Sequence, residues 1–517
     1  MSSPDAVARG KRPPAFSKHL GRAAIGWPDL PAPVRMKRVA LVAADDALRD
    51  VLVRVADAAA VEIGPAGGET GPPGAAGGAA GKGGEAARRL QRRGHPVPGA
   101  ALSPSQPDLD ALERAGRYDL LAGEAQLEAY ATAAVRRSGA CALAGWIPAD
   151  RVAAVAALLA EAGGAMVALP SPRGVQPPTL LSGRPLRRSL SPLVQTYGTV
   201  PYADVDPTWV AWAAYVLMFG MMFGDAGEGA VLLAAAAALR AGWPGWARRF
   251  RRAWPFAAGA GVTAIVFGLL YGECFGPTGL VPAIWLDPLD QPVTLLLVAA
   301  GIGAVMLAGA YALGTVNRWR EGGWPSALYA PSGVAGTMVF LGAGVLAAGW
   351  YYREHPLLAA GGFLALAGLA LAAAGFLAGA GGLRAGGADW LQAIVGLFDL
   401  VIRIGSNVVS FTRLAAFGLT HAALGLLVWE GARALWRHGG VLSMAAVIVF
   451  AAGTVLAFSL EALVAAIQAL RLEYYELFSR VFVTQGRPFR PWHVPVMAGL
   501  GPAAAEIPAS SRQEQCR

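Results

Sequence analysis

The sequence predicts a mainly α-helical protein, with a polytopic membrane domain of eight helices preceded by a short cytoplasmic α/β domain. Hydrophobic residues make up 55% of the 517 residues and charged residues 15%, which is too apolar for a row of soluble domains. All four lysines fall before residue 83, whereas nearly all the uninterrupted apolar runs follow residue 208. The two parts of the chain are therefore expected to lie in different surroundings.

The N-terminal part is predicted to stay on the cytoplasmic side, because residues 1–34 form a polar tail without the apolar core of a signal peptide. Residues 35–200 form the α/β domain, in which the order strand, helix, strand occurs twice. The first set is predicted at 38–42, 45–58 and 61–63, and the second at 141–147, 150–162 and 165–169. We expect two small lobes, separated by a Gly/Pro-rich linker at 64–84 and by helical sequence around 108–137.

The membrane domain is predicted to span residues 201–486, with a cytoplasmic tail at 487–517. About 20 apolar residues cross a bilayer core, and this length indicates eight helices, at 208–223, 226–240, 255–275, 292–316, 331–350, 357–379, 390–430 and 441–483. The first two are short. The last two are longer than a perpendicular span requires, so they are expected to tilt strongly or to project from the bilayer.

The charges of the loops agree with an even number of spans and with both termini in the cytoplasm. The ends predicted to lie inside carry Arg240, Arg248, Arg249, Arg251, Arg252, Arg318, Arg320, Arg384, Arg480, Arg487 and Arg490. The predicted outer loop at 277–291 contains two aspartates and no basic residue, and the other outer loops hold only three arginines. Much of the net charge of +9 is explained in this way without nucleic acid as a partner.

The seventh predicted helix contains charges that are costly inside a membrane. At spacings of four, three, four and three residues, one stripe of this helix carries Asp399, Arg403, Ser406, Ser410 and Arg413. Fourteen residues separate the first from the last, or about 21 Å along the axis. The stripe therefore runs from the inner surface to the middle of the membrane, and His421 lies two turns further out.

The eighth helix runs in the opposite direction and places Glu461, Gln468 and Arg471 on one face. The two helices together bring two arginines near the middle of the membrane. Asp399 lies on their inner side, and His421 and Glu461 lie on their outer side. This arrangement predicts two polar half-paths separated by a fixed positive charge.

A guanidinium group suits the role of a barrier, since it stays protonated and has no acceptor with which to relay protons. A carboxylate brought beside it is stabilised in the ionised form and releases its proton. The alternative is that Arg413 pairs with a neighbouring acid, and that His421 and Glu461 make ordinary interior polar contacts.

Two segments of these helices are specific enough to indicate a family. SFTRLAAFGLTHAAL (410–424) and EALVAAIQALRLEYYELFSRVF (461–482) resemble the signature helices of the membrane subunit a of rotary V-type and A-type ATPases, known as subunit I in prokaryotes. Similar resemblances are found in YGTVPYADVDPTWV, FGMMFGDAGEGA, FGLLYGECFG, GRPFRPW and AGWIPAD, so that most of the chain is covered.

The resemblance implies an eight-helix membrane domain beside a ring of proteolipid c subunits, with peripheral-stalk and central-stalk subunits as further partners. Arg413 corresponds to the family's indispensable arginine and Arg471 to its partner, Glu461 and His421 match outer half-channel positions, and Asp399 matches an inner one. Secondary half-channel candidates are Ser406, Asn407, Gln468, Asp225 and Glu273. The sequence departs from the family pattern at Glu228 and Glu473, and the helical hairpin expected between the two lobes is largely replaced by the linker.

We therefore expect a multi-pass subunit of the cell membrane that carries protons or sodium ions and does not itself hydrolyse ATP. We expect no cofactor and no resident metal, and the three unpaired cysteines argue against a zinc site. The alternative functions are a stand-alone secondary transporter or channel, with its site in broken helices, and a purely structural membrane anchor.

Overall fold

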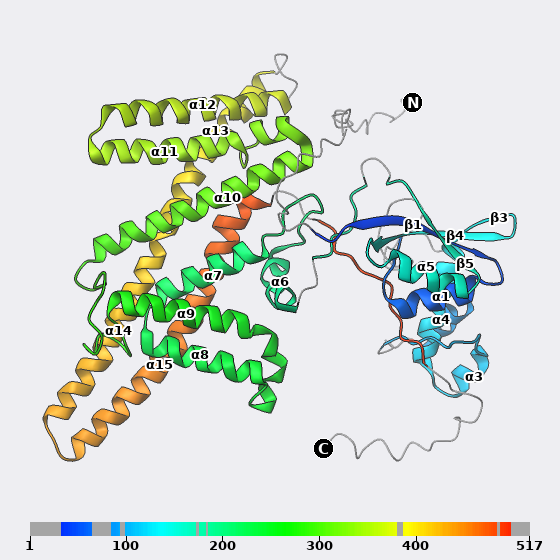
Figure 1. The fold of residues 1–517 in the computed structure, drawn as a ribbon, viewed down its shortest axis with the longest axis horizontal. Coiled ribbons are helices and arrows are strands. Elements are labelled where there is room, and N and C mark those ends of the chain that lie inside the picture. The colour runs from blue at the N-terminus through cyan, green and yellow to red at the C-terminus, as the bar shows by residue number, and fades with distance from the viewer. Residues whose placement is uncertain are drawn as a thin grey trace, which may run out of the picture.

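The computed structural model describes residues 33–64, 84–93, 99–171, 175–181, 185–379, 386–482 and 486–497. The predicted N-terminal tail up to residue 32, most of the Gly/Pro linker, Arg384 and the tail beyond residue 497 lie outside the described residues. The described part is mainly helical, with a small sheet near its N-terminal end (Figure 1).

The sheet contains all the predicted strands, each within two residues of its predicted bounds. Its five strands are β1 (Met36–Ala44), β2 (Glu62–Ile63), β3 (Val135–Arg137), β4 (Ala140–Pro148) and β5 (Gly164–Ala168). The strand order is β2-β4-β1-β5, and β3 also pairs with β4. All the pairings are antiparallel, and β1 pairs with β4 along nine residues, from Met36 opposite Pro148 to Ala44 opposite Ala140.

The prediction of two separate lobes is wrong in the described residues, because the two strand–helix–strand units interleave in one sheet. β4 lies between β1 and β2, and β1 lies between β4 and β5. A unit of two strands leaves its backbone groups unpaired and is marginally stable alone. Interleaving pairs the central strands on both sides, and it lets α1 (Leu48–Ala58) and α5 (Val152–Glu161) share one hydrophobic core with the sheet.

Three more helices complete this domain, namely α2 (Glu85–Arg93), α3 (Leu109–Arg114) and α4 (Tyr118–Ala133). α4 packs against α1 and α2, and its Glu124 forms an ion pair with Arg49 of α1, with Nη1 and Oε2 2.6 Å apart. The helical sequence predicted around 108–137 is thereby confirmed, except that its last three residues form β3.

The membrane part begins after α6 (Pro185–Tyr197). It contains α7 (Thr208–Met222), α8 (Ala226–Ala241), a 3₁₀ segment (Gly245–Ala253), α9 (Trp254–Tyr271), α10 (Pro292–Tyr329), α11 (Val334–Tyr352), α12 (His355–Gly379), α13 (Gly387–Ser410), α14 (Thr412–Arg437), α15 (Val441–Leu472), a π-helical segment (Glu473–Phe478) and α16 (Ser479–Val481). Six continuous helical stretches among the described residues are long and apolar enough to cross a membrane. α7 and α8 have 15 and 16 residues and are shorter than such a span.

The last two helical stretches are long, as predicted. α13 and α14 follow each other with only Phe411 between them and make a stretch of 51 residues, and α15 with its continuation makes one of 41 residues. At 1.5 Å per residue these are about 77 and 62 Å long, more than twice the thickness of a hydrocarbon core. α14 and α15 run side by side as a long antiparallel pair (Figure 1).

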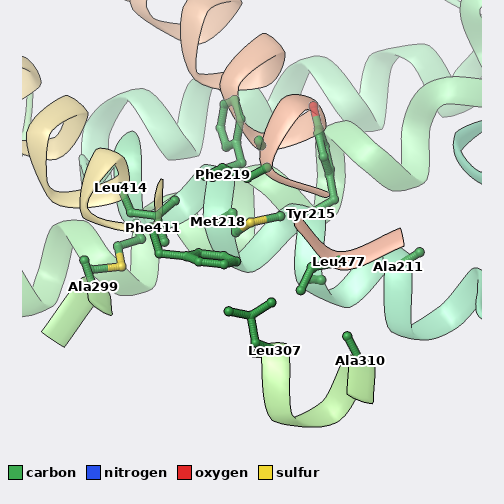
Figure 2. Packing of buried hydrophobic residues seen from close by; sticks show 14 of the residues in the cluster. Ala211, Tyr215, Met218, Phe219, Ala299, Leu307, Ala310, Phe411, Leu414 and Leu477 are labelled. Carbon is green, nitrogen blue, oxygen red and sulfur yellow. The ribbon is translucent and has the colours of Figure 1, made fainter. Parts of the chain in front are cut away.

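One hydrophobic core ties the long helices to the shorter ones. Figure 2 shows side chains from α7, α10, α14 and the π-helical segment gathered around Phe411, which is fully buried. Gly303 of α10 faces this ring, and a β-carbon added at Gly303 would lie 2.2 Å from Cγ of Phe411. The absence of a side chain at Gly303 therefore lets α10 approach the point where α13 passes into α14.

Candidate functional site in the membrane helices

A polar cluster lies where α14 and α15 meet the turn that follows α9. His421 of α14 is hydrogen-bonded through Nδ1 to Oε2 of Glu461 of α15. Its other ring nitrogen, Nε2, lies 3.9 Å from Oε2 of Glu273, and the side chains of His421 and Glu273 are 6% and 3% exposed. The outer-side residues predicted from the sequence, His421, Glu461 and Glu273, therefore come together in the structure.

Asp225 holds the turn that carries Glu273. Its Oδ1 accepts hydrogen bonds from the backbone N–H groups of Glu228, at 2.8 Å, and Phe275, at 2.9 Å, and its Oδ2 accepts one from Gly276, at 2.7 Å. The first of these bonds caps the N-terminus of α8, which is a preferred position for aspartate. Asp225 thus fixes the start of α8 and the turn after α9 relative to each other, and its carboxylate lies within 4.8 Å of the ligand atoms of Glu273 and His421.

Glu228 is a further buried acid at this cluster. It lines one small pocket with Gly276, His421, Thr454 and Glu461, and only 4% of the residue is exposed. Its Oε2 has no hydrogen-bond partner among the described residues. The departure from the family pattern noted at Glu228 therefore places an additional carboxyl group in the same pocket as His421 and Glu461.

Arg413 lies eight residues before His421 on α14, or about 12 Å along the helix axis. Its side chain is half-buried, and its Nη1 has no hydrogen-bond partner among the described residues. On α15, Gln468 is half-buried with its Oε1 unpartnered, whereas Arg471 is exposed. In the described structure, no ion pair joins Arg413 to an acid, contrary to the alternative considered from the sequence.

The predicted inner-side residues of α13 lie on its exposed face. Asp399 and Arg403 form an ion pair with Oδ2 and Nε 2.7 Å apart, and their side chains are 53% and 63% exposed. Ser406 is also exposed, and Ser410 is half-buried. Asp399 therefore has a partner within its own helix, and the pair remains accessible from outside this chain.

Asn407 joins α13 to the π-helical segment. With its amide oriented to satisfy its neighbours, it donates to Oε2 of Glu476 and accepts from Nη2 of Arg480, each at 3.0 Å. Arg480 also lies over the ring of Tyr311, 5.5 Å from its centroid. Asn407 was predicted from the sequence as a half-channel residue, but its partner Glu476 was not.

Glu473 is the second departure from the family pattern, and it lies in the hydrophobic interior. The residue is fully buried, and neither carboxylate oxygen has a hydrogen-bond partner among the described residues. The π-helical turn begins at this residue. Turns of this kind occur mostly as single insertions in α-helices and frequently at functional sites.

A further acidic group that sequence reasoning missed lies just before α7. Asp204 is fully buried, near Arg318 and Glu321 of α10, which themselves form an ion pair with Nη1 and Oε2 2.6 Å apart. Burial and the neighbouring Glu321 raise the pKa of Asp204 to about 7. The motif VPYADVD contains this residue, but only the fold brings it to α10.

Comparison with known proteins agrees with the motifs. Residues 130–278 match the V-type ATPase 116kDa subunit family. The chain is 27% identical to the A-type ATP synthase subunit I of Pyrococcus horikoshii over 58% of this chain and 45% of that protein. It is 26% identical to the subunit I of Thermococcus kodakarensis, over 68% and 54%, and 27% identical to that of Archaeoglobus fulgidus, over 68% and 58%.

In these comparisons the chain is similar to subunit a/I of rotary ATPases. It spans about half the length of the curated relatives it matches. Together with this similarity, the six helical stretches able to cross a membrane indicate a multi-pass membrane protein. The matched region ends at residue 278, just after the turn that Asp225 and Glu273 share. Asp225, Glu228 and Glu273 therefore lie inside it, and His421 and Glu461 lie outside it.

Proposed function

We propose that this chain is the membrane stator subunit of a rotary ATPase and passes protons or sodium ions between the two sides of the membrane and a rotating ring. The observation that carries the proposal is the half-buried Arg413, whose Nη1 is unpartnered within the described chain. A charged group at bilayer depth needs a partner. A carboxylate on a neighbouring proteolipid ring would supply one, and it would be the group that moves the ion.

The proposed topology has eight spans with both termini in the cytoplasm. The six long apolar stretches would be joined by α7 and α8, which meet at the cap formed by Asp225 and are short enough to require local thinning of the bilayer. The excess of arginine at the predicted inner ends supports this orientation. The described arginines between α8 and α9, Arg248, Arg249, Arg251 and Arg252, all lie in the 3₁₀ segment at one such end.

The proposed outer half-channel is the pocket between α8, α14 and α15. His421 and Glu461 share a hydrogen bond there, with Glu273 3.9 Å beyond the ring and Glu228 lining the same space. Imidazole and carboxyl groups within reach of one another pass protons in short steps. Asp225 would contribute by fixing the turn rather than by carrying the ion, because its oxygens accept three backbone hydrogen bonds.

The proposed inner half-channel follows α13. Asp399 and Ser406 are exposed on this helix, and the buried Asn407 bridges Glu476 and Arg480 behind it. Ions would enter at Asp399 from the cytoplasm and reach the ring beside Arg413. Arg471 and Gln468 would complete the barrier from α15.

The rotor ring would dock against apolar surface that the described chain leaves exposed. On α13 this surface includes Phe398, Ile402 and Val409, and on α15 it includes Leu456, Leu463 and Ile467. Aliphatic side chains on long tilted helices suit contact with lipid and with a sliding ring of helices. The N-terminal sheet domain would bind the stalk subunits on the cytoplasmic side.

The test is the change Arg413→Ala in the assembled complex, compared with Arg433→Ala as a control. Arg433 is on the same helix, but it is half exposed and forms a surface ion pair with Glu430, which is of small energetic weight. Arg413→Ala should abolish ATP-driven ion transport while the complex stays assembled, and Arg433→Ala should leave transport near the wild-type rate. Coupled transport by the assembled Arg413→Ala complex would contradict the proposal.

The same preparations separate the stator from a stand-alone transporter. The lone chain, reconstituted into vesicles without the ring, should show no ion flux under a membrane potential. Flux that survives the removal of the ring would favour the transporter instead.

A further inference from the structure

We propose that His421, Glu273 and Asp225 form a binding site for a divalent cation of the zinc class. The three side chains are all buried, and one ligand atom from each lies within 4.8 Å of the others. They come from three separate elements, namely α14, the turn after α9 and the N-cap of α8. The fold, rather than a local motif, therefore assembles the site.

Two of the ligand atoms face each other without a partner. Nε2 of His421 and Oε2 of Glu273 have no hydrogen bond among the described residues, and they lie 3.9 Å apart. Both side chains are more than nine-tenths buried. Two ligands of a tetrahedral zinc ion lie about 3.3 Å apart when each bond is about 2.0 Å. A contraction of about half an ångström, within the reach of side-chain rotation, would bring both to a metal ion.

The other ring nitrogen of His421, Nδ1, is hydrogen-bonded to a carboxylate, as is usual for histidines that bind metals. Glu461 accepts a hydrogen bond at Nδ1 of His421, which leaves the lone pair on Nε2, pointing to Glu273. Histidines that bind metals almost always carry such a carboxylate or carbonyl partner on the other nitrogen. Glu461 would thus be a positioning residue for the metal, not a ligand.

Asp225 has one coordination position left. Its oxygens accept three backbone N–H bonds, two at Oδ1 and one at Oδ2, so Oδ2 keeps a free lone pair. The pocket that Glu228 and His421 line would hold a water molecule as fourth ligand.

The charge of the surroundings suits a divalent cation. If Glu273 and Asp225 bind as carboxylates and His421 as the neutral ring, the two negative charges of the ligands balance a doubly charged ion. Glu461 and Glu228 place two further carboxyl groups at the edge of the site. Among the described residues, no ion pair joins a lysine or arginine to any of these four acids.

Metal binding would stop ion passage, because it takes the lone pair of His421 and the carboxylate of Glu273. This consequence rests on the proposed function, since both residues are placed in the outer half-channel. The binding itself does not rest on it. Separate measurements of zinc binding and of ion transport therefore distinguish a failure of the metal site from a failure of the half-channel.

The binding test uses the purified full-length chain in detergent, stripped with a chelator and titrated with zinc by calorimetry. We expect one zinc per chain, and X-ray absorption at the zinc edge should show one histidine nitrogen with oxygen ligands. His421→Gln should remove this site. Glu461→Gln should weaken zinc binding by about 10- to 100-fold, the usual effect of losing the partner of a metal-binding histidine.

Two control variants exclude other ligands. His438→Gln changes an exposed histidine beyond the end of α14, and Cys274→Ser changes the thiol next to Glu273. Both should keep the zinc affinity of the wild type. The proposal would be overturned by a sulfur ligand in the wild-type spectrum or by the absence of stoichiometric zinc, and neither result needs a variant. It would also be overturned if folded His421→Gln kept the full zinc affinity.

In the assembled complex, zinc should inhibit ATP-driven ion transport reversibly, with restoration by a chelator. Stoichiometric zinc with unchanged transport would keep the metal site and contradict the half-channel at His421. Inhibition without zinc at His421 would contradict the metal site alone.

Discussion

Glu473 is held in an environment that folding alone does not favour. Its carboxyl group is fully buried in the hydrophobic interior, and neither oxygen has a hydrogen-bond partner among the described residues. Burying a polar group without a hydrogen bond costs about 1–3 kcal/mol by mutational measurement. Residues that break a local rule in this way are expected at functional sites. Its position, at the first residue of the π-helical turn beside Glu476, connects it to the network of the proposed inner half-channel.

Glu473→Met is therefore predicted to raise stability and to lower activity. Methionine has a similar length and no polar atom, so the change removes the cost of the unpaired carboxyl group, about 1–3 kcal/mol. The apparent melting temperature of the chain in detergent should rise, while ion transport by the assembled complex should fall. Leu477→Met, a volume-conserving change at a buried position of the same turn, is the control and should alter neither by much. A lower melting temperature for Glu473→Met would show that the carboxyl group is stabilised by contacts beyond the described residues.

At the scale of elements, the polar cluster depends on one close backbone contact. Gly276 ends the turn after α9 with φ of +85°, and its Cα lies against Gly425 of α14. A β-carbon at Gly425 would lie 2.8 Å from Cα of Gly276, which is a backbone atom and cannot rotate away. Two glycines therefore let the turn that carries Glu273 reach His421.

Gly425→Ala is predicted to push the turn away from α14. We expect a loss of about 1–3 kcal/mol, typical of overpacking, seen as a lower melting temperature, together with weaker zinc binding. Gly431→Ala is the matched control, because it lies on the same helix and a β-carbon there meets nothing within 4 Å. This control should be neutral or stabilise the helix by about 0.5–1 kcal/mol. Equal melting temperatures for the two variants would mean that the turn after α9 can move away from α14 without loss of stability.

The elements could be predicted more fully than their contacts. Alternating and continuous apolar runs located four of the five strands and the long C-terminal helices, because these patterns depend on neighbours in sequence, whereas β3 lay in sequence predicted to be helical. Asp225 before an apolar helix also fits the preference for aspartate at an N-cap, a role that was not predicted from the sequence. The interleaving of the strands could not be predicted, since β1 and β4 are joined by backbone bonds between residues about 100 positions apart.

Within the candidate site, helical spacing placed His421 and Glu461 on the same side of the two arginines, and in the structure the two side chains are in contact. The same reasoning placed Asp399 in one stripe with Arg413, but it could not show that Arg403 pairs with Asp399 or that Glu476 bonds to Asn407. Those contacts depend on side-chain direction and on the widened π-helical turn, neither of which has a reliable sequence signal.

At the scale of the whole molecule, the C-terminal segment ties the membrane helices to the N-terminal sheet domain. After α16, residues 486–497 run along the sheet domain (Figure 1). Arg487 forms an ion pair with Glu62, with Nη1 and Oε1 3.0 Å apart. Further along, the backbone N–H of Trp492 donates to the carbonyl of Val61 at 2.9 Å. The backbone N–H of Leu102 donates to the carbonyl of Pro495, and its carbonyl accepts from the N–H of Met497. These contacts join the C-terminal segment to the domain proposed to bind the stalks.

Trp492 is the main anchor of this segment, and its removal tests the connection. The residue is 7% exposed, its ring centroid lies 4.7 Å from that of Tyr130, and its indole N–H donates to Gln126 at 3.1 Å. Trp492→Ala should cost about 3–5 kcal/mol, because it leaves a cavity beside Tyr130. Hydrogen exchange, followed by mass spectrometry, should show faster exchange in β2 and α4 with little change in α14 and α15. Trp350→Ala removes an indole that is 81% exposed on α11 and should leave the sheet domain unchanged. If Trp492→Ala left the exchange of β2 and α4 at the wild-type rate, the sheet domain would be stable without the C-terminal segment, and the two parts of the stator would be coupled by some other contact.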